Sequence, residues 1–230
     1  MNNNIVFIIP STCKKKNNYT NIDDIPLLSI LYKSLINFNI SKYTFIIGMD
    51  DDDEYYLNNL NGIKNKLPNN FHFHFIKNIE NSYVCIVNCL ANLAIKEYSA
   101  EYLYVFADDL IVNTLEHIDI FISYFNKNNN LCLGWGQDQG CLHTCSHPFI
   151  HRNHVDILGF FYPNEIKNWF CDDYIEKLYT KLNKLIKTEK CVINNIIAHR
   201  YDVVHINNSQ LEILVEKSFN IICSSRLMEG

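Results

Sequence analysis

Two adjacent acids, Asp108 and Asp109, follow directly on an apolar stretch of the chain. Residues 102–107 read Tyr-Leu-Tyr-Val-Phe-Ala, which predicts a buried β-strand. Carboxylates at the end of such a strand are costly to bury unless a cation meets them. In open α/β sheets, ligands bind in the crevice beyond the carboxyl ends of the strands. The acids therefore predict a divalent-metal site that also holds phosphate groups. The alternative is an acidic turn followed by a helix that Thr114 caps.

The elements that must position these acids alternate along the first half of the chain. Buried strands are predicted over residues 5–9, 43–47 and 71–76, and helices over residues 26–38, 54–67 and 82–98. We expect Asp23 or Asp24 to cap the first helix, and Asp52 and Asp53 to cap the second. This order predicts an α/β fold with a mostly parallel central sheet and helices on both faces.

The second half of the chain has a less regular pattern. An amphipathic helix is expected from residue 114 to Phe125 and another over residues 174–186, whereas the aromatic, cysteine-rich segment 134–161 has poor periodicity. No linker or internal repeat separates the halves, so residues 1–230 are predicted to form one domain.

Composition excludes several classes of protein. The chain has 230 residues and 48% hydrophobic content, enough for a sizeable core, and its net charge of -5 argues against a nucleic-acid partner. Nine cysteines, an odd number without a regular framework, favour reduced thiols. Without an apolar run of about 20 residues, no transmembrane segment is expected, and without a positively charged start no signal peptide is expected. We therefore expect a cytoplasmic protein.

Four motifs in order resemble those of GT-A glycosyltransferases, most closely the family 2 type, over nearly the whole chain. They are Phe-Ile-Ile-Pro-Ser-Thr at 7–12, Ile-Ile-Gly-Met-Asp-Asp-Asp-Asp at 46–53, Tyr-Val-Phe-Ala-Asp-Asp at 104–109, and Trp-Phe-Cys-Asp-Asp at 169–173. The resemblance implies a GT-A, Rossmann-like fold, with residues 1–113 binding a nucleotide sugar and residues 114–230 facing the acceptor. It implies transfer of a sugar from a nucleotide diphosphate, with UDP favoured, to a glycan, protein or lipid hydroxyl that the sequence does not identify.

The resemblance also implies the donor and metal sites. Pro10, Ser11 and Thr12 would contact the base and ribose, and Asp50 would accept a hydrogen bond from one of them. The acidic pair stands where the family carries its D-x-D motif, although Phe106 replaces the first acid. Neighbouring residues on an extended chain point to opposite sides, so Asp109 is expected to bind the metal and Asp108 to meet the ribose or a metal-bound water. His205 would supply a further ligand, with His199 as its rival, and this donor set suits Mn²⁺ or Mg²⁺.

The acidic dipeptide at 172–173 would supply the catalytic base. By its match to the family, Asp173 is the first choice and Asp172 the second, and an inverting displacement is expected. The alternative is that this dipeptide caps the helix over residues 174–186.

Other interpretations of the sequence stay open. Cys141, His143, Cys145 and His147 alternate and could bind structural zinc, although free thiols in an acceptor loop fit their tight spacing better. Trp135, between two glycines, could stack on a sugar or pack in the core. A nucleotidyltransferase usually has a glycine-rich first loop, which this chain lacks, and a non-catalytic sugar- or nucleotide-binding protein remains the other alternative. A dinucleotide-dependent oxidoreductase is excluded because no G-x-G-x-x-G follows the first strand.

Overall fold

The apolar runs of the first half form neighbouring parallel strands. The computed structural model describes residues 4–14, 19–77, 82–195 and 206–225. In this part of the chain, β1 (Ile5–Pro10) pairs in parallel with β2 (Thr44–Asp50) and with β4 (Tyr102–Val105), and β2 pairs in parallel with β3 (Phe71–Ile76). The strands predicted from apolar runs are therefore confirmed, and the predicted α/β fold with them.

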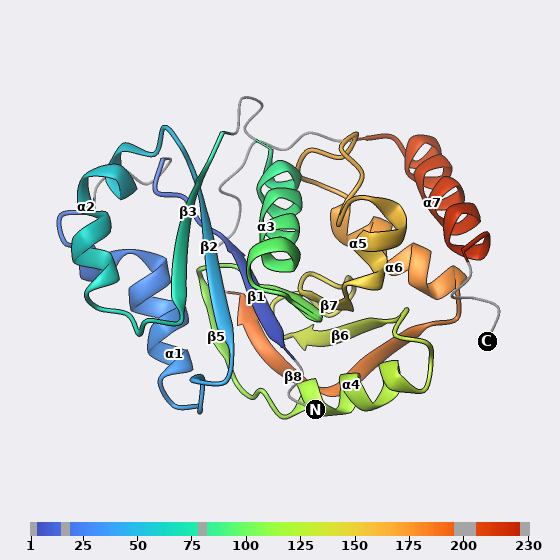
Figure 1. Ribbon diagram of the computed structural model, residues 1–230, viewed down its shortest axis with the longest axis horizontal. Helices are drawn as coiled ribbons and strands as arrows, with labels where there is room; N and C mark the ends of the chain where they lie inside the picture. Colours follow the sequence, from blue (N-terminus) through green and yellow to red (C-terminus); the bar gives the residue numbers. More distant parts are fainter. Residues whose placement is uncertain (1–3, 15–18, 78–81, 196–205, 226–230) are drawn as a thin grey trace.

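Four further strands, which the sequence pattern did not predict, complete the sheet. These are β5 (Leu110–Val112), β6 (Leu133–Asp138), β7 (Pro148–His151) and β8 (Leu185–Asn195), and they extend one curled sheet in the order β3-β2-β1-β4-β7-β6-β8-β5 (Figure 1). β7 is antiparallel to both β4 and β6, and β5 is antiparallel to β8. The sheet is therefore wholly parallel only across its neighbouring strands β3, β2, β1 and β4.

The helices agree with the sequence pattern where that pattern was strong. α3 (Tyr83–Glu97) begins at its N-cap Ser82, and α2 (Glu54–Lys64) begins at Asp53, which accepts a hydrogen bond from the backbone N–H of Tyr56. The helix expected from residue 114 to Phe125 is α4 (His117–Asn126). Two further helices were not predicted, namely α5 (Asn153–Leu158) and α7 (Asn208–Cys223), which starts with a capping box. None of the described helices is long and apolar enough to cross a membrane.

Two predicted helices differ from the structure. The helix expected over 26–38 is a π-helical segment, η2 (Leu27–Tyr32), followed by one turn of α1 (Lys33–Leu35), and its N-cap is Pro26 instead of an aspartate. The aspartates lie in a short 3₁₀ turn, η1 (Ile22–Asp24). The helix expected over 174–186 is α6 (Cys171–Lys181), because Asn183 adopts a left-handed conformation (φ 54°) and the chain then enters β8.

Successive side chains along each strand point to opposite faces of the sheet, so a hydrophobic core forms on each face. On β1, Val6 and Ile8 pack into the cluster beneath α3 and α6, whereas Phe7 and Ile9 pack into the cluster with η2 and α4. The second cluster is strongly aromatic, since the Phe7 ring stacks on those of Phe45 and Tyr104 with centroids 4.7 and 5.5 Å apart. Burial on both faces explains why these strands are almost continuously apolar.

One buried amide joins α3 to the segment that precedes α6. Asn88 Oδ1 accepts hydrogen bonds from the backbone N–H groups of Phe161 and Tyr162, both at 2.9 Å. Its Nδ2 donates to the Tyr162 carbonyl at 2.8 Å and to Asn164 Oδ1 at 2.9 Å. The hydrogen-bonding capacity of this side chain is therefore filled.

Gly136 in β6 is required by packing, because a Cβ atom there would lie 2.6 Å from the Tyr104 hydroxyl and 2.7 Å from Val192 Cγ2. We expect Gly136→Ala to lower the free energy of unfolding by about 1–3 kcal/mol through overpacking. Urea unfolding monitored by circular dichroism measures this change. Gly159→Ala is the matched control for backbone strain alone, since Gly159 has φ 81° but no atom within 4 Å of an added Cβ. Equal losses in the two variants would contradict the packing explanation.

Candidate functional site

The carboxyl ends of several strands meet at one edge of the sheet. β1, β2 and β4 are parallel, and β6 runs in the same direction because β7 is antiparallel to both β4 and β6. Polar side chains that are less than 10% exposed gather at these strand ends, namely Ser11, Thr12, Asp50, Asp53, Asp108, Asp109, Asp138 and His147. Buried polar groups concentrated at the carboxyl edge of an α/β sheet mark a candidate ligand site.

The loop after β1 is tied to its neighbours by side-chain hydrogen bonds. The Ser11 hydroxyl donates to Asp108 Oδ2, and the Tyr56 hydroxyl lies 2.5 Å from Ser11 Oγ. The Thr12 hydroxyl donates to Asp53 Oδ2 at 3.0 Å. The structure thus joins Ser11 to Asp108 and Thr12 to Asp53, directly after Pro10 at the end of β1.

Asp108 and Asp109 lie side by side between β4 and β5, and each is 1% exposed. Carboxylate oxygens are hard ligands of the kind that Mn²⁺ and Mg²⁺ prefer, and burial of two neighbouring carboxylates favours a cation beside them. Their donor chemistry therefore fits the implied metal. His205 and His199 lie outside the described residues, and within the described ranges no group of three or more His, Cys, Asp or Glu side chains is arranged to hold a metal ion.

Asp50, at the end of β2, is covered by Lys14. The Lys14 ammonium lies 2.9 Å from Asp50 Oδ2 and also pairs with the exposed Asp52. Partial burial lowers the pKa of Lys14, but hydrogen bonds and charge from Asp52 and Asp50 outweigh this and raise it above its usual value. Asp52 therefore binds Lys14 instead of capping α2, whereas the cap predicted at Asp53 is confirmed.

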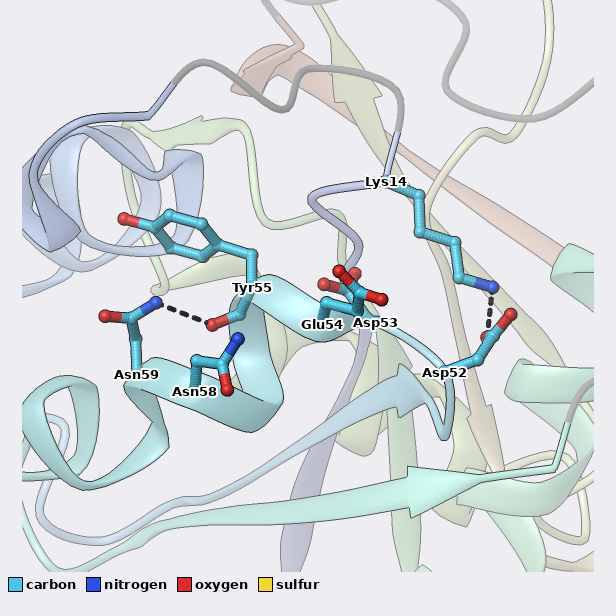
Figure 2. Close-up of a pocket in the computed structure, with 7 residues that line it drawn as sticks. All are labelled: Lys14, Asp52, Asp53, Glu54, Tyr55, Asn58 and Asn59. Atoms are coloured by element: carbon cyan, nitrogen blue, oxygen red, sulfur yellow. Dashed lines mark hydrogen bonds and ion pairs between the residues drawn. The ribbon is translucent and has the colours of Figure 1, made fainter.

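A pocket of about 390 Å³ opens beside this ion pair, at the start of α2 (Figure 2). It is lined by Lys14, residues 52–55, Asn58 and Asn59. Its volume lies within the range of small-molecule sites, and its polar lining suits a polar ligand.

We expect Lys14→Met to destabilise the protein by about 2 kcal/mol, because the buried carboxylate of Asp50 loses a cationic partner. The loss stays below that of a fully buried pair because the Lys14 side chain is partly exposed to solvent. Chemical denaturation at low salt measures this loss. Lys66→Met is the matched control, since Lys66 pairs with Asp23 where both side chains are exposed, and we expect it to cost less than about 0.5 kcal/mol. A Lys14 variant as stable as the control would show that the pair with Asp50 contributes little.

Asp172 and Asp173 lie in the first turn of α6, whose N-cap is Phe170 with φ 72°. Neither acid caps the helix, so the alternative capping role predicted from the sequence is wrong. Burial of the Asp172 carboxyl raises its pKa to about 7, and the charges of Asp173, Glu176 and Asp138 add to this rise. The Cys171 thiol, 3.4 Å from Asp172 Oδ1, opposes it. Asp172 can therefore exchange a proton near neutral pH.

Asp138, at the end of β6, was missed by the sequence analysis. It is fully buried, and its Oδ1 accepts from the backbone N–H groups of Gly140 (2.9 Å) and Asn195 (3.0 Å), while its Oδ2 accepts from Ser146 Oγ (3.2 Å). His147 Nε2 lies 3.7 Å from the same oxygen, and burial lowers the pKa of this histidine to about 4. Asp138 thus holds residues 139–147 against β8.

The other residues that the sequence suggested for zinc or sugar binding are placed differently in the structure. Cys145 and His147 are buried while His143 is exposed, so the four alternating Cys and His side chains do not share one face. Trp135 is 5% exposed, and Lys187 Nζ lies 3.6 Å from its ring centre. Trp135 therefore packs in the core, and the glycines beside it give room to Phe121 and Tyr104.

Comparison with known proteins identifies the fold. No protein-family profile and no curated protein sequence matches the chain. Among solved structures, TarS 1-349 of S. aureus in complex with UDP-GlcNAc is similar over 97% of this chain and 67% of its own, with a TM-score of 0.63 and 12% identity. The UDP complex of TarS 1-349 covers 99% of this chain and 74% of its own, with a TM-score of 0.59 and 12% identity. The mannosyltransferase PcManGT of Pyrobaculum calidifontis, in complex with GDP-Man and Mn²⁺, covers 85% of this chain and 57% of its own at 10% identity, with a TM-score of 0.59. At such low identity these matches show that the chain shares the α/β fold of TarS and of the mannosyltransferase PcManGT.

Proposed function

We propose that this protein is a glycosyltransferase that moves a sugar from a nucleotide diphosphate sugar, preferably a UDP-sugar, to a hydroxyl acceptor. The observation that carries the proposal is the burial of Asp108 and Asp109 beside the loop Pro10–Thr12, at the carboxyl edge of this fold. Structures of the same fold contain UDP-GlcNAc or GDP-Man, which supports a nucleotide-sugar donor. We further propose that residues 1–230 act as one unit, with the donor bound by the first half and the acceptor by the second.

In the donor half, Ser11, Thr12 and Asp50 would bind the base and ribose. The hydrogen bond from Ser11 to Asp108 supports a shared role for this loop and this acid in holding the ribose. Asp109, and in part Asp108, would hold a divalent metal, with His205 as a proposed third ligand. Such a metal, when bound, neutralises charge on the departing diphosphate. PcManGT in complex with Mn²⁺ supports manganese as the metal.

In the acceptor half, Asp172 would take the proton from the acceptor hydroxyl, with Asp173 as the second candidate. The pKa of Asp172 near 7 supports this order, because a base works best with a pKa near the working pH. A single displacement assisted by this base would invert the anomeric configuration.

Nucleotide binding and turnover test the proposal. We expect UDP or GDP with Mn²⁺ to raise the midpoint of thermal unfolding, and UDP-GlcNAc or GDP-Man to be slowly hydrolysed. Stabilisation by a nucleoside diphosphate without turnover of any sugar would favour a non-catalytic binding protein. Release of pyrophosphate from UTP and a sugar phosphate would favour a nucleotidyltransferase.

A further inference from the structure

We propose that Lys14 closes the donor site by covering Asp50, and that the base or ribose of a nucleotide displaces it there. The inference rests on the proposed function, which assigns Asp50 to the base and ribose. It adds a contact that keeps this site closed in the absence of a nucleotide, and it names the part of the ligand that opens the site.

The Asp50 carboxylate, at the end of β2, is covered while Lys14 is paired with it. Its side chain is 1% exposed, and Lys14 Nζ lies 2.9 Å from its Oδ2. An N–H or O–H group of a ligand has to approach a carboxylate oxygen to about 3 Å to form a hydrogen bond with it. The ammonium already occupies such a position at Oδ2, so Lys14 and the ligand compete for Asp50.

The Lys14 side chain lies on the solvent side of this pair and can move away from it. It is 25% exposed, and its second partner, Asp52, is 72% exposed. Figure 2 shows the arm extending from the loop after β1 towards Asp52. Ion pairs between exposed side chains contribute little to stability, and the lysine stem is flexible. The contact with Asp52 therefore does not fix the ammonium over Asp50.

The pocket at the start of α2 provides space for the displaced arm. Lys14 lines this pocket together with Asp52, Glu54 and Tyr55 (Figure 2), and the pocket volume of about 390 Å³ exceeds that of a lysine side chain. Asp52 and Glu54 are exposed, so an ammonium that leaves Asp50 keeps anionic groups around it. The main contact that displacement breaks is therefore the one with Asp50.

The group that replaces the ammonium has to be a hydrogen-bond donor. A buried carboxylate that loses its cation is strongly destabilising unless another donor meets it. An N–H group of a nucleobase or a ribose hydroxyl supplies such a donor. A phosphate oxygen carries the same charge as Asp50 and is repelled by it. We therefore expect a nucleoside to displace Lys14, whereas pyrophosphate does not.

Competition between Lys14 and the ligand fixes the sign of a mutational effect. A ligand that binds only the open state has an apparent Kd equal to its intrinsic Kd divided by the open fraction. Removal of the Lys14 ammonium makes Asp50 available in all molecules, so binding should become tighter. A lysine that bound the nucleotide directly would give the opposite result, because its loss would weaken binding.

Calorimetric titration with uridine measures this effect. We expect Lys14→Met to lower the Kd for uridine at least fivefold, in a variant that circular dichroism shows to be folded. Uridine is uncharged, so the change does not report attraction between Lys14 and phosphate groups. Lys66→Met, in the exposed pair with Asp23, is the matched control and should change this Kd less than twofold. Uridine binding that is unchanged or weaker in Lys14→Met would overturn the inference.

Acetylation of lysines in the wild-type protein gives a second test that needs no variant. Acetic anhydride reacts with the uncharged amine. Although partial burial lowers the pKa of Lys14, hydrogen bonds with Asp52 and Asp50 raise it overall, so Lys14 should react slowly in the free protein. We expect uridine to accelerate acetylation of Lys14 at least threefold, measured by mass spectrometry, and to leave the rate at Lys66 unchanged.

Two outcomes of this second test would contradict the inference. Acetylation of Lys14 that uridine leaves unchanged or slows would show that the ammonium stays in place or binds the ligand. Equal acceleration by pyrophosphate would show that phosphate groups, and not the nucleoside, displace it. Failure of the wild-type protein to bind UDP with Mn²⁺ would instead remove the proposed function on which the inference rests.

Discussion

Asp109→Asn is expected to lower metal-dependent turnover of a nucleotide sugar by about 10²–10³-fold, the size of effect seen when one electrostatic contact to a transition state is removed. Asparagine keeps the shape of the side chain but removes the charge that would attract the cation. Asp109 is 1% exposed, so the free energy of unfolding of the variant must be measured beside its activity. Steady-state assays over a range of Mn²⁺ concentrations, together with urea unfolding, separate the two effects.

The matched control is Asp119→Asn, which removes an exposed carboxylate of α4. We expect this variant to retain full activity. UDP binding without metal should also survive in Asp109→Asn, because the loop after β1 is untouched. Wild-type turnover that persists in excess chelator would refute the metal role of this acid.

Asp172→Asn is expected to lower kcat by about 10²–10⁴-fold, the usual contribution of a general base. The pH dependence of the wild-type protein follows from the same group. With a pKa near 7, Asp172 is protonated at lower pH, so the rate should fall by up to tenfold for each pH unit below 7. Rates of nucleotide release at saturating donor between pH 5 and 9 measure this limb.

The Asp172 carboxyl also makes the free energy of unfolding depend on pH, but stability rises as pH falls whereas the reaction rate falls. Because its pKa is raised on folding, the folded protein binds more protons than the unfolded chain between about pH 4 and 7. The contribution of Asp172 to stability therefore rises as pH falls from 7 towards 4, and Asp172→Asn should remove it. If Asp173→Asn abolishes turnover while Asp172→Asn does not, the base is Asp173.

The sequence analysis predicted the strands and helices whose apolar pattern was regular. Strand 71–76 and the helix capped by Ser82 were located to within a residue, because the strand alternates Phe with His and the helix has buried apolar side chains on one face. β8 was missed because residues 185–191 are mostly polar and only half-buried or exposed, so they lack the alternation of a strand with one buried face. β5 has only three residues, too few to show a period.

Part of the candidate site was predictable because some of its acids directly follow regular apolar strands. Asp50 and Asp108 end strongly apolar strands, so their position at the sheet edge followed from the pattern. Asp138 also ends a strand, but glycines on both sides of Trp135 hid that strand. The Lys14 contact with Asp50 depends on the path of the loop after β1, and the effect of Asp138 on Asp172 depends on how β6 and α6 are placed in the fold, which no local pattern encodes.

The four hydrogen bonds of Asn88 connect α3 to the segment before α6 through a single side chain. This residue belongs to α3, which leads into the strand before Asp108, and it grips the backbone of Tyr162. Hydrolysis of this amide over the lifetime of the protein, which consumes water and releases ammonia, would leave an aspartate of nearly the same size. Two attractive contacts would then become repulsive, because a carboxylate oxygen would face the Tyr162 carbonyl and Asn164 Oδ1. Chemical ageing at one internal position would thus weaken the contact between α3 and the segment before α6 without disturbing any apolar contact.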